Sequence, residues 1–243
     1  MNILITGASR GIGRAMAIEF AKNKHDLLIT YKSKKKDTML FKKELEEKYG
    51  INCYVMKCDI GKEMDIDFLV SAVRKYFDHL DGLVNNAGIA LDNDFELKDK
   101  EEFLKVLNVN LIGTYLMCKK FGKMMYDNKR GKIINIGSTN GIDTPYMESV
   151  DYDASKAGII SLTHNFANYL APYVCVNAVC PGWINTDMNN NLSDSFRKRE
   201  TRKILAKRFG EPSEVAKLVY FLMSDDASYI NDAIIRIDGG CKR

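Results

Sequence analysis

The sequence predicts an α/β fold, with one doubly wound parallel sheet of about seven strands and helices on both faces. Short apolar runs alternate with amphipathic segments along all 243 residues. Several of these runs are continuously β-branched, which is typical of strands that helices cover on both sides. No repeat, low-complexity tract or Pro/Gly-rich linker divides the chain. We therefore expect a single domain over residues 1–243.

Each expected strand is a short apolar run rich in Ile, Leu, Val and Tyr, the residues that fit a buried pleated sheet. The strands are expected at Asn2–Thr6, Asp26–Tyr31, Asn52–Lys57, Gly82–Val84, Lys132–Ile136, Val174–Val179 and Ala233–Ile237.

The segments between the strands have helical periodicity. Helices are expected at Ile12–Lys22, Thr38–Tyr49, Asp65–Phe77, Glu101–Tyr126, Tyr152–Leu170 and Ser213–Ser224. In the third of these, apolar side chains recur every three or four residues, which is the spacing of a buried helical stripe.

Composition limits the class of protein. Hydrophobic residues make up 46% and charged residues 28% of the chain, an ordinary globular balance. The net charge of +4 is too small to indicate a nucleic-acid partner. No run approaches a membrane span, and no signal peptide precedes the first strand, so the expected location is the cytoplasm. The six cysteines form no C-x-x-C pair and the three histidines are scattered, so we expect no metal site.

One segment, residues 185–208, breaks the alternation of strands and helices. It is rich in Asn, Ser and Arg and has few apolar residues. Long insertions in compact domains are often lids over a site. A substrate lid and an ordinary surface helix with its loop are both compatible with this composition.

A glycine-rich turn, Thr6–Gly13, lies between the first strand and the first helix. Gly7, Gly11 and Gly13 follow a G-x-x-x-G-x-G spacing. Glycines at this place let the backbone approach a pyrophosphate, while the helix N-terminus offers free N–H groups. The turn predicts a Rossmann-type nucleotide site.

The end of the second strand predicts which nucleotide binds. A carboxylate there would select NAD, whereas cations would suit the 2′-phosphate of NADP. The strand ends Ile29-Thr30-Tyr31-Lys32-Ser33-Lys34 without a carboxylate. We expect NADPH, with Arg10 and Lys32 at the phosphate. The alternative is that these lysines only keep an exposed loop soluble.

Tyr152 and Lys156 are four residues apart, so a helix places both on one face. A nearby ammonium favours phenolate, and we expect it to lower the pKa of Tyr152 towards neutrality. Such a tyrosine can exchange a proton at physiological pH. Ser138, at the end of a buried strand, is placed to hydrogen-bond a carbonyl. The segment Pro181–Thr186 follows another strand end at the same sheet edge.

Together these residues resemble the classical short-chain dehydrogenases/reductases. The motifs occur in the family's order over nearly the whole chain. They are TGASRGIG (Thr6–Gly13), CDI (Cys58–Ile60), NNAG (Asn85–Gly88), NVNLIG (Asn108–Gly113), Ser138, YDASK (Tyr152–Lys156), PGWINT (Pro181–Thr186), RFGEPSEVA (Arg208–Ala216) and IDGG (Ile237–Gly240).

The resemblance implies a carbonyl reductase in which Tyr152 is the general acid. Lys156 would bind the nicotinamide ribose and lower the tyrosine pKa, Ser138 would polarise the carbonyl, and Asn110 would hold a water in the proton relay. Asp59 would bind the adenine amino group. The full set expected to bind NADPH is Gly7, Ser9, Arg10, Gly11, Ile12, Gly13, Lys32, Asp59, Ile60, Asn86, Ala87, Gly88, Tyr152, Lys156, Pro181, Gly182, Ile184 and Thr186.

Within the family, the chain is most similar to the 3-oxoacyl-[acyl-carrier-protein] reductases, which implies a carrier-linked substrate and a homotetramer. The long helices beginning at Glu101 and Tyr152 would form an interface. Three features differ from that group. Ser138 and Tyr152 are fourteen residues apart instead of thirteen, the basic residue before Val174 is missing, and Asn231-Asp232 replaces Thr-Gly.

Two alternatives stay open. A dehydrogenase of a sugar, polyol or other small alcohol would carry the same motifs. Asn140, Asp143 and Glu148 favour a polar substrate, unless they simply face water. A non-catalytic NADP-binding regulator could use the same fold, but such proteins usually lack the tyrosine or the lysine.

Overall fold

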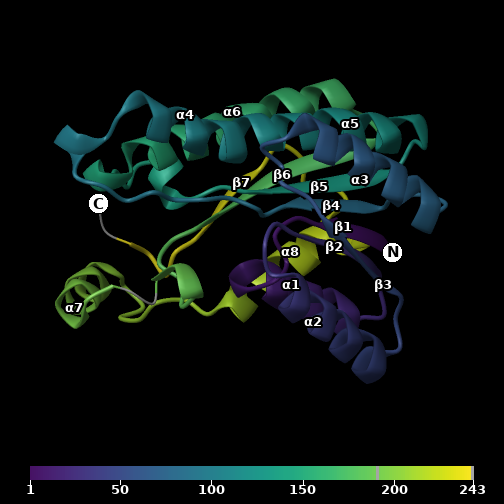
Figure 1. Ribbon diagram of the computed structural model, residues 1–243, viewed down its shortest axis with the longest axis horizontal. Coiled ribbons are helices and arrows are strands. Elements are labelled where there is room, and N and C mark those ends of the chain that lie inside the picture. The colour runs from purple at the N-terminus through teal and green to yellow at the C-terminus, as the bar shows by residue number, and fades with distance from the viewer. Residues whose placement is uncertain (190–191, 242–243) are drawn as a thin grey trace.

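The computed structural model describes residues 1–189 and 192–241, which form one seven-stranded sheet whose strand pairings are all parallel (Figure 1). The strand order is β3-β2-β1-β4-β5-β6-β7. The strands are β1 (Asn2–Ile5), β2 (Asp26–Tyr31), β3 (Cys53–Lys57), β4 (Gly82–Asn85), β5 (Gly131–Ile136), β6 (Val174–Pro181) and β7 (Ile234–Ile237). The predicted fold class is confirmed, and each expected strand is present within two residues of its predicted bounds.

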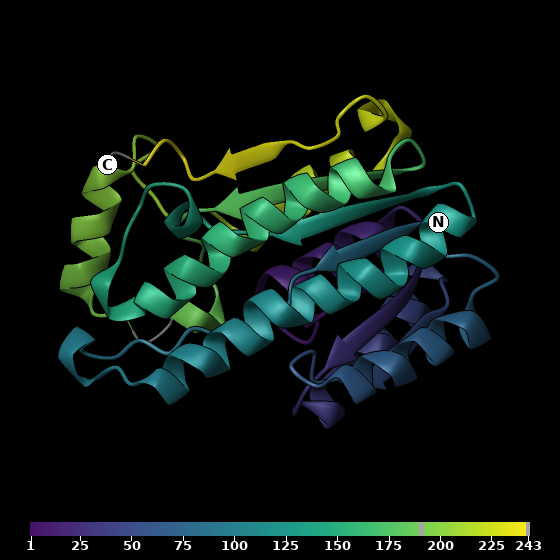
Figure 2. The ribbon, with the colours of Figure 1, turned by 90° about the horizontal axis from the view of Figure 1, so that it is seen from above.

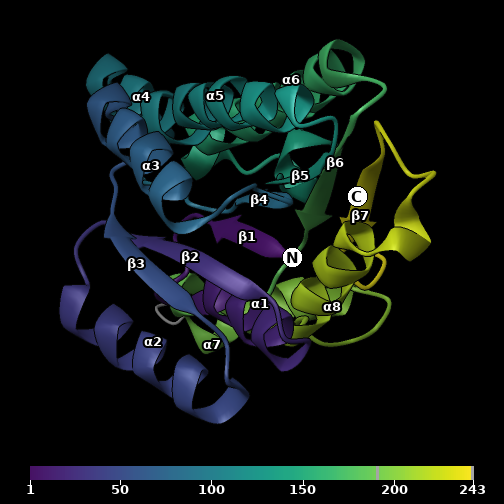
Figure 3. The same ribbon diagram turned by 90° about the vertical axis from the view of Figure 1, so that its right-hand side faces the viewer.

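Helices cover both faces of the sheet, as Figure 3 shows edge-on. One face carries α1 (Gly11–Lys22), α2 (Lys35–Tyr49) and α8 (Pro212–Met223), and the other carries α3 (Glu63–Tyr76), α4 (Lys100–Leu107), α5 (Gly113–Asp127) and α6 (Val150–Leu170).

The alternation along β1 explains the two layers of core. Ile3 and Ile5 pack with Phe20 of α1 in one hydrophobic cluster, whereas Leu4 packs with Phe121 of α5 in the other. Successive side chains of a strand point to opposite faces, so a single apolar run supplies both cores. The continuous apolar strands seen in the sequence are therefore explained.

The expected helix Glu101–Tyr126 is helical throughout, but its middle is not α-helical. Between α4 and α5, residues Asn108–Ile112 form a π-helical turn, in which the backbone is wound one residue wider. Such turns occur mostly as single insertions at functional sites. This turn carries Asn110, so the regular periodicity of the segment concealed the irregularity at a candidate site residue.

Residues 185–208 contain a helix, α7 (Asp194–Lys203), which agrees with the surface helix kept open as one interpretation of this segment, although no bounds were predicted for it. Ser193 caps it by accepting a hydrogen bond from Phe196 N. Its polar sequence gives it no apolar stripe, which is the signal used to find the other helices. Residues 190–191 of the expected lid lie outside the described residues, and its role as a lid stays a prediction. Among the described residues, no helix has the length and apolar character needed to span a membrane.

Candidate active site

A cavity of about 550 Å³ opens at the carboxyl ends of the central strands, where α/β sheets of this type bind ligands. It brings together the turn after β1, the ends of β2, β4, β5 and β6, the start of α6, and α7. All the residues expected to bind the cofactor line it, and so do Ser138, Tyr152 and Lys156. Asn110 is completely buried and does not line the cavity.

The glycine turn has the shape that a pyrophosphate requires. Gly7 and Gly11 adopt positive φ angles of 66° and 55°, which other residues rarely adopt. A Cβ on Gly13 would lie 2.5 Å from the carbonyl oxygen of Gly7. Asn86 donates its side-chain N–H groups to the carbonyls of Thr6 (2.9 Å) and Gly7 (3.1 Å), which fixes the turn against the segment after β4.

The N-terminus of α1 meets this turn with its N–H groups uncapped by any described side chain. Helix N-termini of this kind bind phosphate, because free N–H groups and the helix dipole both favour an anion. The glycine turn and the uncapped helix together fit the pyrophosphate of a dinucleotide.

Lys32 and Arg10, the two cations expected at the 2′-phosphate, both line the cavity, but they differ in whether another side chain already binds them. Lys32 forms an ion pair of 2.8 Å with Asp59, a residue that the sequence assigned separately to adenine. Burial acts to raise the pKa of Asp59, but hydrogen bonds from Lys32 and from Gly61 N outweigh it and hold the pKa below its usual value. Arg10 is exposed, and its guanidinium has no hydrogen bond or ion pair within the described ranges. Arg10 is therefore available to an anionic ligand, as is Lys34, which is also exposed and lines the cavity.

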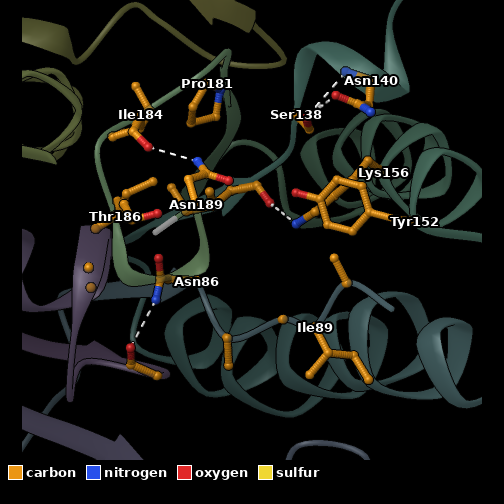
Figure 4. A pocket seen from close by; sticks show the side chains of 18 of the residues that line it. Asn86, Ile89, Ser138, Asn140, Tyr152, Lys156, Pro181, Ile184, Thr186 and Asn189 are labelled. Atoms are coloured by element: carbon orange, nitrogen blue, oxygen red, sulfur yellow. Dashed lines mark hydrogen bonds between the residues drawn. The ribbon is translucent and has the colours of Figure 1, made fainter. Parts of the chain in front are cut away.

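The first two turns of α6 carry the candidate acid and its neighbour. Lys156 is 4% exposed, and its Nζ donates to the carbonyl of Ile136 at 2.8 Å and lies 5.3 Å from the ring centroid of Tyr152. Figure 4 shows Ser138, Tyr152 and Lys156 together, across the pocket from Ile184 and Thr186. The residues that the sequence assigned to chemistry and to the nicotinamide thus face one another.

The expected pKa of Tyr152 is wrong for this arrangement. Burial raises it to about 12, and a hydrogen bond with Ser138 opposes this only in part. Burial also lowers the pKa of Lys156 to about 8. The sequence argument considered only the charge of the ammonium, whereas loss of water from both groups dominates. The phenol holds its proton at neutral pH, and the ammonium is the group that exchanges a proton near that pH.

Ser138 is oriented by two residues whose roles the sequence did not reveal. Its Oγ donates to Asn140 Oδ1 (3.1 Å) and accepts from Asn140 N (3.2 Å). Asn140 Nδ2 donates to Asp153 at 2.7 Å, and the other Asp153 oxygen accepts from Tyr146 N at 2.7 Å. Asn140 was interpreted as facing substrate or water, but it supports the serine. The one feature of the sequence that could have indicated a role for Asp153 at the site is that it directly follows Tyr152.

Asn110 fixes the segment after β4. Its amide exchanges two hydrogen bonds with the backbone of Ile89, Nδ2 to O at 2.9 Å and N to Oδ1 at 2.8 Å. Nδ2 also donates to Ser155 Oγ of α6 at 3.1 Å. Both polar atoms of the Asn110 side chain therefore take part in hydrogen bonds that hold the fold together, and its role in a proton relay stays a prediction.

The loop between Ser138 and Tyr152 is fixed at two points. A Cβ on Gly141 would lie 2.4 Å from the backbone carbon of Lys156, so this turn lies directly against α6. Asp143 accepts two hydrogen bonds of 2.7 Å from Arg236 of β7. Because Asp143 is held by this arginine and Glu148 is exposed, these carboxylates lend no support to a polar substrate.

A buried ion pair adjoins the catalytic helix. Lys98 Nζ lies 2.9 Å from Asp151 Oδ2, and the two side chains are 2% and 0% exposed. Lys98 also donates to the carbonyl of Leu91 at 2.6 Å, while Asp151 Oδ1 accepts from Tyr152 N at 2.8 Å. The pair therefore connects the loop after β4 with the backbone of Tyr152. The sequence could not reveal it because the partners are 53 residues apart.

Comparison with known proteins defines the class. A family model described as Enoyl-(Acyl carrier protein) reductase matches residues 7–242. The chain is 38% identical to the 3-oxoacyl-[acyl-carrier-protein] reductase FabG of Aquifex aeolicus, over 98% of this chain and 95% of the relative. The chain belongs to the short-chain dehydrogenase/reductase family.

Two solved structures share the fold. Levodione reductase matches with a TM-score of 0.93 and 32% identity, covering 98% of this chain and 96% of its own. YwfH, an NADPH dependent reductase involved in bacilysin biosynthesis, matches with a TM-score of 0.92 and 25% identity, covering 98% and 97%. The protein is therefore an oxidoreductase acting on CH–OH or C=O groups, in a family that uses NAD(P)H.

Proposed function

We propose that the protein is an NADPH-dependent reductase of 3-oxoacyl thioesters linked to acyl carrier protein. The observation that carries this proposal is the pairing of a complete reductase constellation, Ser138, Tyr152 and Lys156, with 38% identity to a 3-oxoacyl-[acyl-carrier-protein] reductase over nearly the whole chain. The exposed Arg10 supports NADPH over NADH, since a 2′-phosphate requires a cation at the ribose.

In this proposal the hydride for the ketone carbon would come from NADPH bound in the cavity. Tyr152 donates its phenolic proton to the ketone oxygen, so the carbonyl becomes a secondary alcohol. Ser138 turns its one hydroxyl proton from Asn140 Oδ1 to that oxygen, while Asn140 N still donates to Ser138 Oγ and keeps the hydroxyl in place. Lys156 then returns a proton towards the phenolate. Gly7, Gly11 and Gly13 with the N-terminus of α1 would hold the pyrophosphate, and Pro181–Thr186, which also lines the cavity, would contact the nicotinamide.

The test is NADPH oxidation with an acetoacetyl thioester, compared with sugars and small ketones. We expect kcat/KM for the thioester to exceed that for every sugar by at least about tenfold. Activity on the sugars or ketones alone would contradict the thioester and keep the reductase class. The second candidate, a reductase or dehydrogenase of a small carbonyl or alcohol, is favoured by the close structural match to levodione reductase.

We also propose a homotetramer built on the outer faces of α4 to α6. Figure 2 shows α5 and α6 side by side over the sheet, and these two helices contact each other directly. Three large apolar side chains of this region, Leu104, Ile112 and Tyr115, are between 37% and 52% exposed. Sedimentation velocity of the protein gives the assembly state.

Arg10→Gln is expected to weaken NADPH binding about tenfold and to leave NADH binding unchanged, because one charge-assisted hydrogen bond to the 2′-phosphate is lost. Fluorescence titration of both nucleotides measures the two dissociation constants. Arg14→Gln is the matched control, since Arg14 lies one turn along the same helix, pairs with Glu44 and does not line the cavity. Tighter binding of NADH than NADPH by the unaltered protein would overturn the cofactor assignment.

The pH dependence of reduction should follow Lys156. With the pKa of Lys156 at about 8 and that of Tyr152 at about 12, the phenol stays protonated while the ammonium loses its proton. The value of kcat/KM should be level below pH 8 and fall tenfold per pH unit above it, because this parameter reports the free enzyme's groups. A decline that begins only above pH 11 would assign the limiting proton to Tyr152 instead.

A further inference from the structure

Helix α7 supplies a charged wall to the cavity, through Arg199, Glu200 and Lys203. Glu200 is only 7% exposed. Arg199 Nε donates to Glu200 Oε1 at 3.0 Å, and Lys203 Nζ donates to both Glu200 oxygens at 3.0 Å. Burial acts to raise the pKa of Glu200, but these hydrogen bonds outweigh it and hold the pKa below its usual value. Two cations around one carboxylate leave a net positive charge on this wall.

Arg199 is held in place with part of its guanidinium uncommitted. The group lies 4.7 Å from the ring centroid of Phe196, and only Nε contacts Glu200. The two terminal nitrogens, Nη1 and Nη2, have no hydrogen-bond partner in the part of the chain that the structure describes. A planar guanidinium with its two terminal nitrogens available matches the oxygens of a phosphate, which it can bind through two parallel hydrogen bonds.

This wall lies on the catalytic side of the cavity. The Phe196 ring packs edge-on against Tyr146 and Trp183, at centroid distances of 6.2 and 5.3 Å. Tyr146 is connected through Asp153 and Asn140 to Ser138. Figure 2 shows the arrowheads of β6 and β7 directed towards α7, so this helix lies beyond the strand ends that carry the site.

The cavity thus has two separate cationic regions. Arg10 and Lys32 belong to the phosphate-turn and ribose end, on β1–α1 and β2. Arg199 and Lys203 belong to α7, next to the residues that surround Ser138. A dinucleotide accounts for the first region. The second lies where the other reactant would bind, and its net positive charge suits an anion on that reactant.

We propose that Arg199 and Lys203 form a subsite for the phosphate of a 4′-phosphopantetheine arm, whose thioester end reaches Ser138 and Tyr152. The inference rests on the proposed thioester function. It names a determinant within the substrate, because an acyl group carried on this arm is covalently connected to a phosphate at the arm's other end. Carrier protein and coenzyme A both present that phosphate, so the shared chemistry is a phosphate ester of pantetheine.

The test compares acetoacetyl-4′-phosphopantetheine with acetoacetyl-pantetheine, which differ only in the phosphate. Arg199→Gln is expected to raise KM for the phosphorylated substrate about tenfold, while kcat and the KM for acetoacetyl-pantetheine stay unchanged. Lys203 still pairs with Glu200 in this variant, so the buried carboxylate keeps a partner. Lys203→Gln is the second variant and should act in the same direction.

Arg202→Gln is the matched control. It removes the same charge from the same helix, but Arg202 is exposed and does not line the cavity. It should leave both KM values unchanged. An equal loss in Arg199→Gln and Arg202→Gln would show a general charge effect of α7 and overturn the subsite. A rise in the KM for NADPH in Arg199→Gln would assign the wall to the cofactor and overturn it as well.

A further substrate distinguishes the source of the phosphate. Acetoacetyl-carrier protein and acetoacetyl-coenzyme A should both lose affinity in Arg199→Gln if the arm is recognised. Loss with the carrier-linked substrate alone would show that α7 contacts the carrier's surface and would contradict a subsite for the arm. Failure of the proposed function gives a different result, since no acetoacetyl thioester would then be reduced by the unaltered protein.

Discussion

Replacing Tyr152 with Phe is expected to lower the turnover number about 10³-fold and to leave NADPH binding within about twofold of the unaltered protein. A positioned general acid contributes roughly 10²–10⁴-fold to a rate, and Phe removes the phenolic proton of Tyr152 beside Ser138 and Lys156. The ring itself remains, so the packing around it is kept. Single-turnover oxidation of NADPH with saturating acetoacetyl thioester measures the loss, and fluorescence titration measures the binding.

Tyr169→Phe is the matched control for this experiment. It makes the same substitution on the same helix, but Tyr169 is 68% exposed and does not line the cavity. It should retain full turnover. Turnover of Tyr152→Phe within tenfold of the unaltered protein would show that another group supplies the proton.

The second large effect concerns the buried pair Lys98 and Asp151. Asp151→Asn keeps the shape of the side chain but leaves the Lys98 ammonium buried without its counter-charge. Breaking a buried pair from one side costs about 3–5 kcal/mol of the free energy of unfolding. At roughly 2–4 °C per kcal/mol for a chain of this size, the melting temperature should fall by about 6–20 °C. Urea unfolding followed by circular dichroism measures the free energy.

The double variant Lys98→Met with Asp151→Asn tests whether the loss comes from the unpaired charge. Removing both charges should restore a large part of the stability, because the uncompensated ammonium is gone. Lys123→Met is a control on an exposed lysine whose pair with Asp127 is solvated, and it should leave the urea midpoint unchanged. A destabilisation below about 1 kcal/mol in Asp151→Asn would mean that the pair contributes little to the fold.

The fold could be predicted from the sequence wherever a local pattern determines the structure. The apolar runs located every strand, since a strand buried on both faces needs little more than a short β-branched run. The same reasoning left α7 without bounds, because its charged side chains form no buried stripe, and it missed the π-helical turn at Asn110. One residue of extra winding leaves the helical periodicity on either side intact.

The same limit applies to the site, where pairs within one helical turn could be predicted and pairs formed between distant segments could not. Tyr152 and Lys156 could be paired from the sequence because four residues make one helical turn. Lys32 and Asp59 were each identified but not paired, since they follow neighbouring strands, β2 and β3, which only the sheet brings together. The pKa of Tyr152 was mispredicted for a similar reason. A sequence shows which charges are near in the chain, but the loss of solvent that dominates this pKa depends on the whole fold.

Gly141 packs directly against the backbone of α6, and this limits where the loop between Ser138 and Tyr152 can change in length. The loop begins at a turn locked against Lys156 and ends at Asp151, whose carboxylate is fixed by Lys98. An inserted residue must therefore be accommodated between these two anchors, at the rim of the cavity. The extra residue between Ser138 and Tyr152 can reshape the entrance without moving either hydroxyl. Substrate preference and proton chemistry can thus change independently of each other, through loop length in one case and helix geometry in the other.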